Sequence, residues 1–221
     1  MNKVLIETTA DGSHTLFVPD LNEHYHSVNG AIQESRHVFI EAGLKKCLKN
    51  EISVLEIGFG TGLNAYLTLL YSIEEKKNIF YSTVELHPLV PEIINNLNYT
   101  RQLPGYDYLF SLLHGVSWDT EHEVTPTFCL KKVHTDFSLL NYEYNRTFDL
   151  IYFDAFAPEK QPSLWTQEIF DFIYKQTNMN GIIVTYCAKG AVRRMIQSAG
   201  FIIERLPGPP GKREMLRGIK K

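Results

Sequence analysis

The stretch VLEIGFGTGLNAYL, residues 54–67, decides the fold that this sequence predicts. An apolar strand ends at Glu56 and Ile57, three glycines follow at alternate positions, and a helical segment comes next. Glycine allows a tight turn and lets a ligand come close to the backbone. We therefore expect a ligand-binding loop between a strand and a helix, formed by Gly58, Gly60 and Gly62.

The loop fits neither of two common nucleotide-binding patterns. Leu63 stands after the third glycine, so the spacing does not complete G-x-G-x-x-G, and no Gly-Lys-Ser/Thr follows to hold a triphosphate. The acid on the preceding strand, Glu56, suits a cationic or hydroxyl-bearing ligand better than a pyrophosphate. S-adenosylmethionine, which carries a sulfonium, an ammonium and a ribose diol, is a ligand of this kind.

Strands and helices alternate on both sides of this loop. Continuous apolar runs at 53–57 and 149–153 are typical of strands that are covered on both faces. The alternation predicts an α/β, Rossmann-like doubly wound sheet, in which ligands bind at the carboxyl ends of the strands. We expect strands at 52–57, 79–86, 148–153, 181–186 and 201–206, helices at 62–73, 88–97, 162–176 and 191–200, and a final edge strand at 213–220.

The N-terminal region lacks the strand–helix alternation of the rest. Two short strands flank an Ala-Asp-Gly-Ser turn, and a helix is expected from about Ser35. We therefore divide the chain into an N-terminal β extension, residues 1–34, and a main domain, residues 35–221.

Three acids lie at strand ends in a pattern that resembles class I methyltransferases, and this resemblance implies S-adenosylmethionine as the cofactor. Glu56 with the glycines is similar to their first motif. Glu85 matches the acid that takes the ribose hydroxyls, and Asp136 matches the position that meets the adenine amino group. Acids in such loops also cap helices, and for each single acid both interpretations stay open.

A narrower resemblance begins at Asp154. The stretch FDAFAPEKQPSLWTQEIF, residues 153–170, is similar to a signature of the methyltransferase domain of the bifunctional tRNA-modifying MnmC enzymes and of their stand-alone relatives, MnmD. The stretches NGAIQESRHVFIEAGL (29–44) and AGFIIERLPGPPGKREML (199–216) also resemble family motifs. The resemblance runs from about Tyr25 to Gly218. One departure is Pro209-Pro210 in the closing loop, which stiffens the loop and removes two N–H donors.

The resemblance implies a tRNA-modifying N-methyltransferase. The acceptor would be the amine of 5-aminomethyl-2-thiouridine at the wobble position, and the product 5-methylaminomethyl-2-thiouridine. Asp154 would orient the amine and accept its proton. Phe156 and Trp165 are candidates for stacking on the base, although both rings also suit a packed core. The chain is too short for the family's oxidase domain, so we expect another enzyme to supply the aminomethyl group.

The charge distribution bears on the partner. The formal net charge is −3, but residues 187–221 carry nine Lys and Arg against two Glu, which leaves −10 on the rest. A basic end on an acidic body suits phosphate binding, and it also fits a solvated charged edge. As partner we expect the tRNA anticodon stem-loop, held by Arg193, Arg194, Lys212 and Arg213.

Other classes of protein fit less well. Three well-separated cysteines indicate a reducing compartment, so we expect a cytoplasmic protein without a disulfide framework. No apolar run is long enough for a membrane span, and the eight histidines match no metal-ligand spacing, so we expect neither a membrane nor a metal. Two alternatives stay open: an aminopropyltransferase of the spermidine-synthase type acting on a small amine, and a noncatalytic RNA-binding module.

Overall fold

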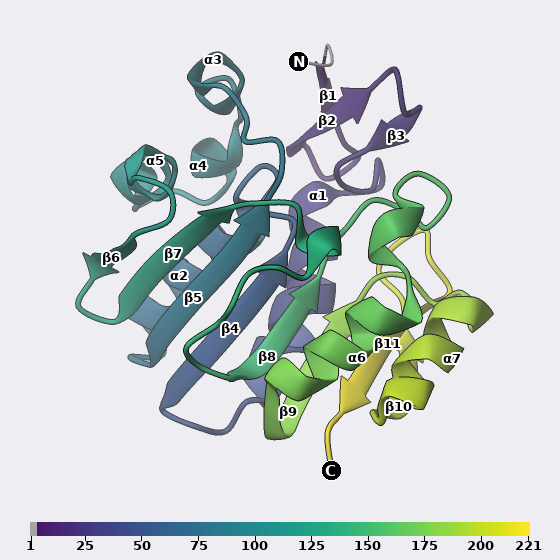
Figure 1. The fold of residues 1–221 in the computed structure, drawn as a ribbon. Coiled ribbons are helices and arrows are strands. Elements are labelled where there is room, and N and C mark those ends of the chain that lie inside the picture. Colours follow the sequence, from purple (N-terminus) through teal and green to yellow (C-terminus); the bar gives the residue numbers. More distant parts are fainter. Residues whose placement is uncertain (1–3) are drawn as a thin grey trace.

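The computed structural model describes residues 4–221, which are built around one eight-stranded sheet (Figure 1). Its strands are β4 (Glu51–Ile57), β5 (Asn78–Glu85), β6 (Glu121–Thr125), β7 (Phe128–His134), β8 (Phe148–Phe153), β9 (Thr177–Thr185), β10 (Ile202–Pro207) and β11 (Glu214–Ile219). The order across the sheet is β10-β11-β9-β8-β4-β5-β7-β6. Neighbours from β9 to β7 are parallel, and the outer pairs are antiparallel. The predicted α/β architecture is confirmed.

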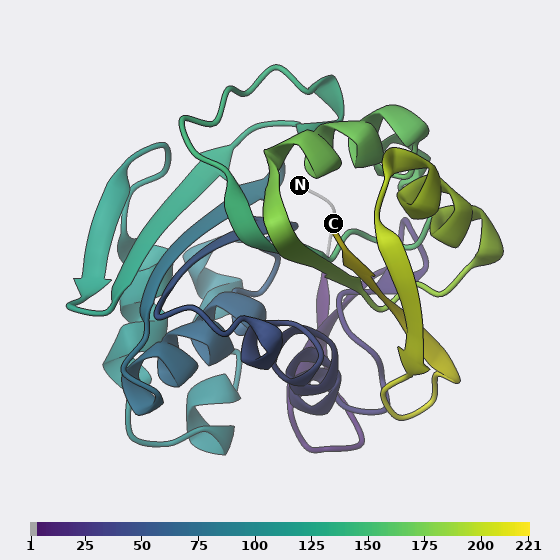
Figure 2. The same cartoon turned by 90° about the horizontal axis from the view of Figure 1, so that it is seen from below.

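Helices cover both faces of the sheet, as the view from below shows (Figure 2). On one face, Tyr66 of α2 (Leu63–Glu74) and Tyr81 of β5 belong to one core, which also takes in α1 (Ala31–Ser35) and α5 (Asp107–Gly115). On the other face, Phe170 of α6 (Gln167–Gln176) packs with Phe153 of β8. The helical segments are α1 (Ala31–Ser35), the π-helix η1 (Arg36–Glu41), η2 (Leu44–Lys46), α2 (Leu63–Glu74), α3 (Pro91–Ile94), α4 (Tyr99–Gln102), α5 (Asp107–Gly115), η3 (Phe137–Leu139), η4 (Pro162–Leu164), α6 (Gln167–Gln176) and α7 (Gly190–Ala199).

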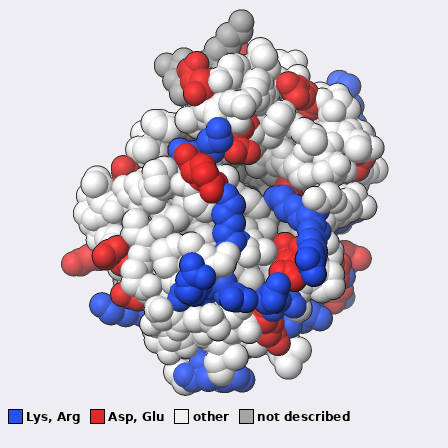
Figure 3. All heavy atoms as spheres, turned by 90° about the vertical axis from the view of Figure 1, so that its right-hand side faces the viewer, with Lys and Arg blue, Asp and Glu red and all other residues white. Residues whose placement is uncertain are grey.

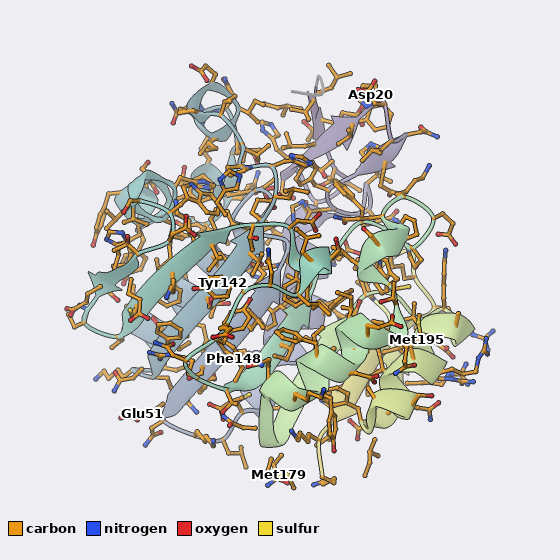
Figure 4. All side chains as sticks on the ribbon, in the orientation of Figure 1. Asp20, Glu51, Tyr142, Phe148, Met179 and Met195 are labelled. Atoms are coloured by element: carbon orange, nitrogen blue, oxygen red, sulfur yellow. The ribbon has the colours of Figure 1, made fainter. Side chains whose placement is uncertain are left out.

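A small antiparallel sheet lies over the carboxyl ends of the main strands. It consists of β1 (Leu5–Thr8), β2 (His14–Val18) and β3 (Glu23–His24). Figure 4 shows its outer turn through Asp20 at the top, while Glu51 and Met179, near the starts of β4 and β9, mark the opposite end. The two expected N-terminal strands are therefore present, and a domain boundary after residue 34 stays a prediction.

The turn between β1 and β2 holds the start of α1. The Asp11 carboxylate accepts the backbone N–H of Gln33 at 2.9 Å, and the Thr9 hydroxyl accepts that of Ala31 at 3.3 Å. The Ser13 hydroxyl accepts the N–H of Ile32 at 3.2 Å. The first N–H groups of a helix have no partner inside it, so these side chains act as caps supplied from a distant turn. Helical structure thus starts at Ala31, four residues before the expected start at Ser35.

Two other expectations about elements are wrong. The strand at the C-terminal end is not the sheet edge, because β11 lies between β9 and β10, with Met215 and Leu216 fully buried. The helix expected at 88–97 is reduced to Pro91–Ile94, none of whose residues is buried, so it lacks the packing that stabilises longer helices. Among residues 4–221, no helix is long and apolar enough to cross a membrane.

Candidate active site

A cavity of about 610 Å³ opens at the carboxyl ends of the central strands. Its walls include Gly58 after β4, Glu85 at the end of β5, and Asp154 after β8. Strands β5 and β8 lie on opposite sides of β4. The cavity therefore occupies the point at which the strand order reverses, where open α/β sheets bind their ligands.

The glycine loop needs glycine for steric reasons. Gly58 and Gly60 have φ angles of 96° and 51°, in the left-handed region that favours glycine. A Cβ on Gly58 would stand 2.6 Å from the backbone oxygen of Asp154. The loop therefore packs closely against the segment after β8, and α2 begins directly behind it at Leu63. A helix start of this kind turns backbone N–H groups toward a bound ligand.

Two of the predicted cofactor acids lie in the cavity wall. Both oxygens of Glu85 are fixed by the backbone, since Gly60 N–H donates at 3.0 Å and His87 N–H at 2.8 Å. Asp136 accepts from the backbone and hydroxyl of Ser138 through one oxygen, at 2.9 and 2.7 Å. Both carboxylates are thus oriented beside the cavity, and their roles toward a ribose and an adenine stay predictions.

Glu56 lies too deep in the protein to contact a ligand in the cavity. The side chain is fully buried beneath the glycine loop and does not line the cavity. One oxygen accepts a hydrogen bond from the Thr83 hydroxyl at 2.7 Å, and the other has no partner. Burial raises the pKa of Glu56 to about 8. Its predicted effect on a cofactor would therefore act through the loop.

Asp154, the predicted base, lies in the cavity wall. The Asn64 amide donates to its Oδ2 at 2.8 Å from the first turn of α2. Burial raises the pKa of Asp154 to about 7, and Glu34 adds to the rise, whereas Asn64 and Lys212 oppose it. A carboxyl group with a pKa near the working pH is well suited to accept a proton.

The two predicted aromatic residues have different environments. Phe156 lines the cavity, and the Tyr25 ring meets it edge to face, with centroids 5.1 Å apart. Trp165 is only 6% exposed and packs against Phe153 at 4.8 Å. Its indole N–H donates to the backbone oxygen of Phe156 at 2.8 Å. Trp165 thus supports the loop from below, and of the two rings Phe156 alone lines the cavity.

The four predicted basic residues also separate into two groups. Lys212 lines the cavity, donates to Glu34 at 2.7 Å, and lies 3.8 Å above the Tyr186 ring. Three arginines stand outside the cavity wall, on α7 and on the loop between β10 and β11: Arg193, Arg194 and Arg213.

Sequence reasoning missed several side chains of this wall. Glu34, Tyr25 and Tyr186 lie at or near recognisable motifs, but their contacts come from segments far apart in the chain. Asn64 was signalled only by its place in the first turn after the glycines. Within residues 4–221, no group of three or more His, Cys, Asp or Glu side chains is arranged to hold a metal ion.

Comparisons with known proteins bear on the family and the fold. Residues 112–221 match a family described as S-adenosyl-L-methionine-dependent methyltransferase. The bifunctional protein MnmC of tRNA 5-methylaminomethyl-2-thiouridine biosynthesis from Marinomonas sp. (strain MWYL1) is 26% identical over 211 residues, which is 88% of this chain and 31% of that protein. Its counterpart from Burkholderia thailandensis is 29% identical over 222 residues, or 92% and 33%.

A solved structure extends the similarity over the whole chain. The crystal structure of MNMC2 from Aquifex aeolicus superposes with a TM-score of 0.83 at 27% identity, covering 100% of this chain and 71% of that one. The chain is related to the MnmC methyltransferases. The family resemblance and the class I methyltransferase fold are thereby confirmed, and the matched family supports S-adenosylmethionine as cofactor.

The extent of these matches differs between relatives. The chain spans about a third of the length of the curated relatives it matches. The spermidine synthase of Thermotoga maritima has a TM-score of 0.58 at 16% identity, which indicates a shared fold alone. The sequence relatives therefore do not favour the aminopropyltransferase alternative.

Proposed function

We propose that this protein transfers a methyl group from S-adenosylmethionine to the amine of 5-aminomethyl-2-thiouridine at the wobble position of tRNA. The product is 5-methylaminomethyl-2-thiouridine. The observation that carries this proposal is the position of Asp154, whose carboxyl group lies where the glycine loop meets the Phe156 loop and has a pKa of about 7. The substrate follows from relatives whose names include tRNA 5-methylaminomethyl-2-thiouridine biosynthesis.

The cavity residues fit this cofactor. Glu85 presents a carboxylate held by two backbone N–H groups, as a ribose diol requires, and Asp136 stands nearby for the adenine amine. Gly58 and Gly60 let the loop pack against the other walls of the cavity, since a Cβ would stand 2.6 Å from the Asp154 backbone oxygen and 3.1 Å from the Tyr25 ring. The bound cofactor supplies an electrophilic methyl group, and these residues hold and orient it.

Asp154 prepares the acceptor for attack. A primary alkylamine is largely protonated near neutral pH and must lose a proton to expose its lone pair. The carboxylate attracts the ammonium, orients it and takes that proton, while the Asn64 amide keeps Oδ2 in place. Placement contributes most of the rate, since well-oriented reactants gain roughly 7–11 kcal/mol.

The aromatic side of the cavity suits a base taken out of its loop. Phe156 is half-buried, so part of its ring can stack on a pyrimidine, and Tyr25 braces its edge. Trp165 holds the backbone of Phe156 through its indole N–H. Tyr186 donates to the backbone oxygen of Ala155 at 2.8 Å and fixes the other side of Asp154.

The outer arginines suit the phosphates of an anticodon stem-loop. Figure 3 shows Lys and Arg side chains gathered on the side of the molecule that carries α7 and the β10–β11 hairpin. Arg194 and Arg213 are exposed there, and Lys160 reaches the cavity rim from the Phe156 loop. Phosphate contacts of this kind make affinity fall steeply with salt.

A methylation assay tests the reaction. The protein is incubated with labelled S-adenosylmethionine and tRNA carrying 5-aminomethyl-2-thiouridine, and the nucleosides are read by mass spectrometry. We expect one added methyl at the wobble nucleoside and a loss of about 10²- to 10⁴-fold in the Asp154→Asn variant. Cofactor binding without any tRNA labelling refutes the substrate. Aminopropyl transfer from decarboxylated S-adenosylmethionine to a free amine, measured in a separate assay, instead supports the aminopropyltransferase alternative.

Salt dependence tests the partner. We expect Arg194→Gln with Arg213→Gln to weaken tRNA binding and flatten the slope of log affinity against log salt by about 2. Lys46→Gln is the matched control, because Lys46 is exposed near the starts of the strands, away from the cavity. Equal effects of the two changes contradict the proposed surface.

A further inference from the structure

An ion pair in the cavity wall joins an N-terminal and a C-terminal segment of the chain. Lys212 Nζ, in the β10–β11 loop, donates to Glu34 Oε1 at 2.7 Å, although 178 positions separate the two residues. The other oxygen of Glu34 accepts the backbone N–H of Ser27 at 2.7 Å. The Glu34 side chain is 8% exposed and that of Lys212 33%, so the pair is partly shielded from water. A shielded pair acts on its neighbours more strongly than a surface pair does.

The same lysine lies on the wall that contains the base. Its ammonium is 3.8 Å from the centroid of the Tyr186 ring, and the Tyr186 hydroxyl donates to Ala155, the residue after Asp154. Lys212, Glu34, Tyr186 and Asp154 all line the cavity. A phosphate-gripping lysine would be expected outside, beside the arginines, so this position requires another role.

We propose that Lys212 and Glu34 complete the acceptor-amine site, where the Lys212 ammonium disfavours protonation of the acceptor nitrogen and of Asp154, and Glu34 holds that ammonium in place and opposes its effect. Both are positioning residues, since neither exchanges a proton. The role depends on the proposed amine methylation and adds to it the electrostatic selection of a neutral amine.

The proton balance explains the benefit. The acceptor ammonium gives one proton to Asp154 and becomes a neutral amine. Its lone pair forms the new C–N bond as the S–C bond breaks and leaves its electron pair on sulfur. A like charge within about 4–6 Å lowers the pKa of an amine, and an opposite charge lowers that of a carboxyl group. Lys212 acts in both ways, and Glu34 opposes it; at Asp154 the effect of Glu34 is the larger of the two.

Other titratable groups lie near Lys212, Glu34 and Asp154, and their titration must be distinguished from that of Asp154. Burial lowers the pKa of His26 to about 4 and raises that of Tyr186, so both stay neutral near pH 7. Glu56, beneath the loop, has a pKa of about 8 and is the same in each variant below. The remaining titratable groups of the wall are Glu23, His24, Tyr25, Glu85, His87, Asp136 and Lys160, and they too are the same in each variant.

Opposite pH shifts test the role. At saturating tRNA and S-adenosylmethionine, we expect the acidic limb of kcat to move up by about one pH unit in Lys212→Met, roughly tenfold in rate on that limb. In Glu34→Gln the limb should move down, because Lys212 is no longer offset. Lys212→Arg should keep the wild-type limb. Coincident limbs, or shifts in the same direction, overturn the proposed role.

A second measurement does not depend on turnover. Carbon-13 NMR of protein with labelled aspartate carboxyls follows the Asp154 signal, identified by its loss in Asp154→Asn. Its midpoint should rise in Lys212→Met and fall in Glu34→Gln. Wild-type protein that does not methylate the tRNA refutes the proposed function, while unmoved midpoints refute the role of the pair. Arg213→Gln is the matched control, expected to raise KM for tRNA without moving either titration.

Discussion

Replacing Glu56 by Gln should stabilise the protein, and by more as pH rises. Burial holds the pKa of Glu56 at about 8, against an ordinary value of 4.5. Between these values the folded protein keeps the proton that the unfolded chain releases. Stability therefore falls with rising pH, by about 1.4 kcal/mol per unit, and the loss approaches about 5 kcal/mol above pH 8. Below pH 4.5 both states hold the proton and the loss disappears.

The structure indicates that Gln is accommodated. Glu56 Oε1 and Asn64 Oδ1 are both buried without a hydrogen-bond partner, and the two side chains are neighbours. A protonated Glu56 can donate to Asn64, and the amide of Gln can do the same at nearly the same volume. The Thr83 hydroxyl can still donate to the remaining oxygen. The substitution therefore removes the titration and keeps the contacts.

The assay is chemical denaturation of both proteins from pH 5 to pH 7.5. The difference in free energy of unfolding should grow by about 3 kcal/mol over this range in favour of Glu56→Gln. Glu51→Gln is the control, since Glu51 is exposed at the start of the same strand (Figure 4). A difference that stays constant with pH, or one that grows in favour of the wild type, refutes the reasoning.

Further changes test the cavity and its supports. The wild-type kcat should fall about tenfold per unit below pH 7, because the pKa of Asp154 is about 7, and a pH-independent rate contradicts its role as base. Gly58→Ala should lower stability by about 1–3 kcal/mol and weaken S-adenosylmethionine binding in calorimetry, since its Cβ meets a backbone oxygen at positive φ. Trp165→Phe removes the N–H that holds Phe156, so KM for tRNA should rise while cofactor affinity stays. Asp11→Ala should cost about 1 kcal/mol in thermal unfolding through the lost cap on α1.

Local patterns predicted the centre of the molecule well. The apolar runs before Gly58 and Asp154 are buried parallel strands, and Asp154 lies beside the glycine loop because neighbouring parallel strands end at the same edge. The order of β10 and β11 was missed, since an antiparallel hairpin can dock by either strand and the choice depends on burial of Met215 and Leu216.

Long-range contacts account for what the sequence could not predict in the site. The partner of Lys212 lies 178 positions away, and nothing local distinguishes this lysine from the exposed Arg213 beside it. Trp165 looks like a stacking platform in sequence, yet its ring is needed in the core and only its N–H serves the Phe156 loop. A motif fixes residue types, whereas packing decides which atoms reach the cavity.

The side-chain caps on α1 have a consequence for tolerance to inserted sequence. α1 and η1, which follows it directly, form a helical segment of eleven residues, which is too short to be stable by itself. Its start therefore depends on the turn of Thr9, Asp11 and Ser13 for N–H partners. Added residues in that turn would displace the helix that carries Glu34, and Lys212 would lose its ion-pair partner. Asp20, which is exposed in the turn between β2 and β3, accepts none of the N–H groups at the start of α1. A peptide tag or a fluorophore at Asp20 should leave the fold intact, whereas the same addition at Asp11 should disturb a cavity it never touches.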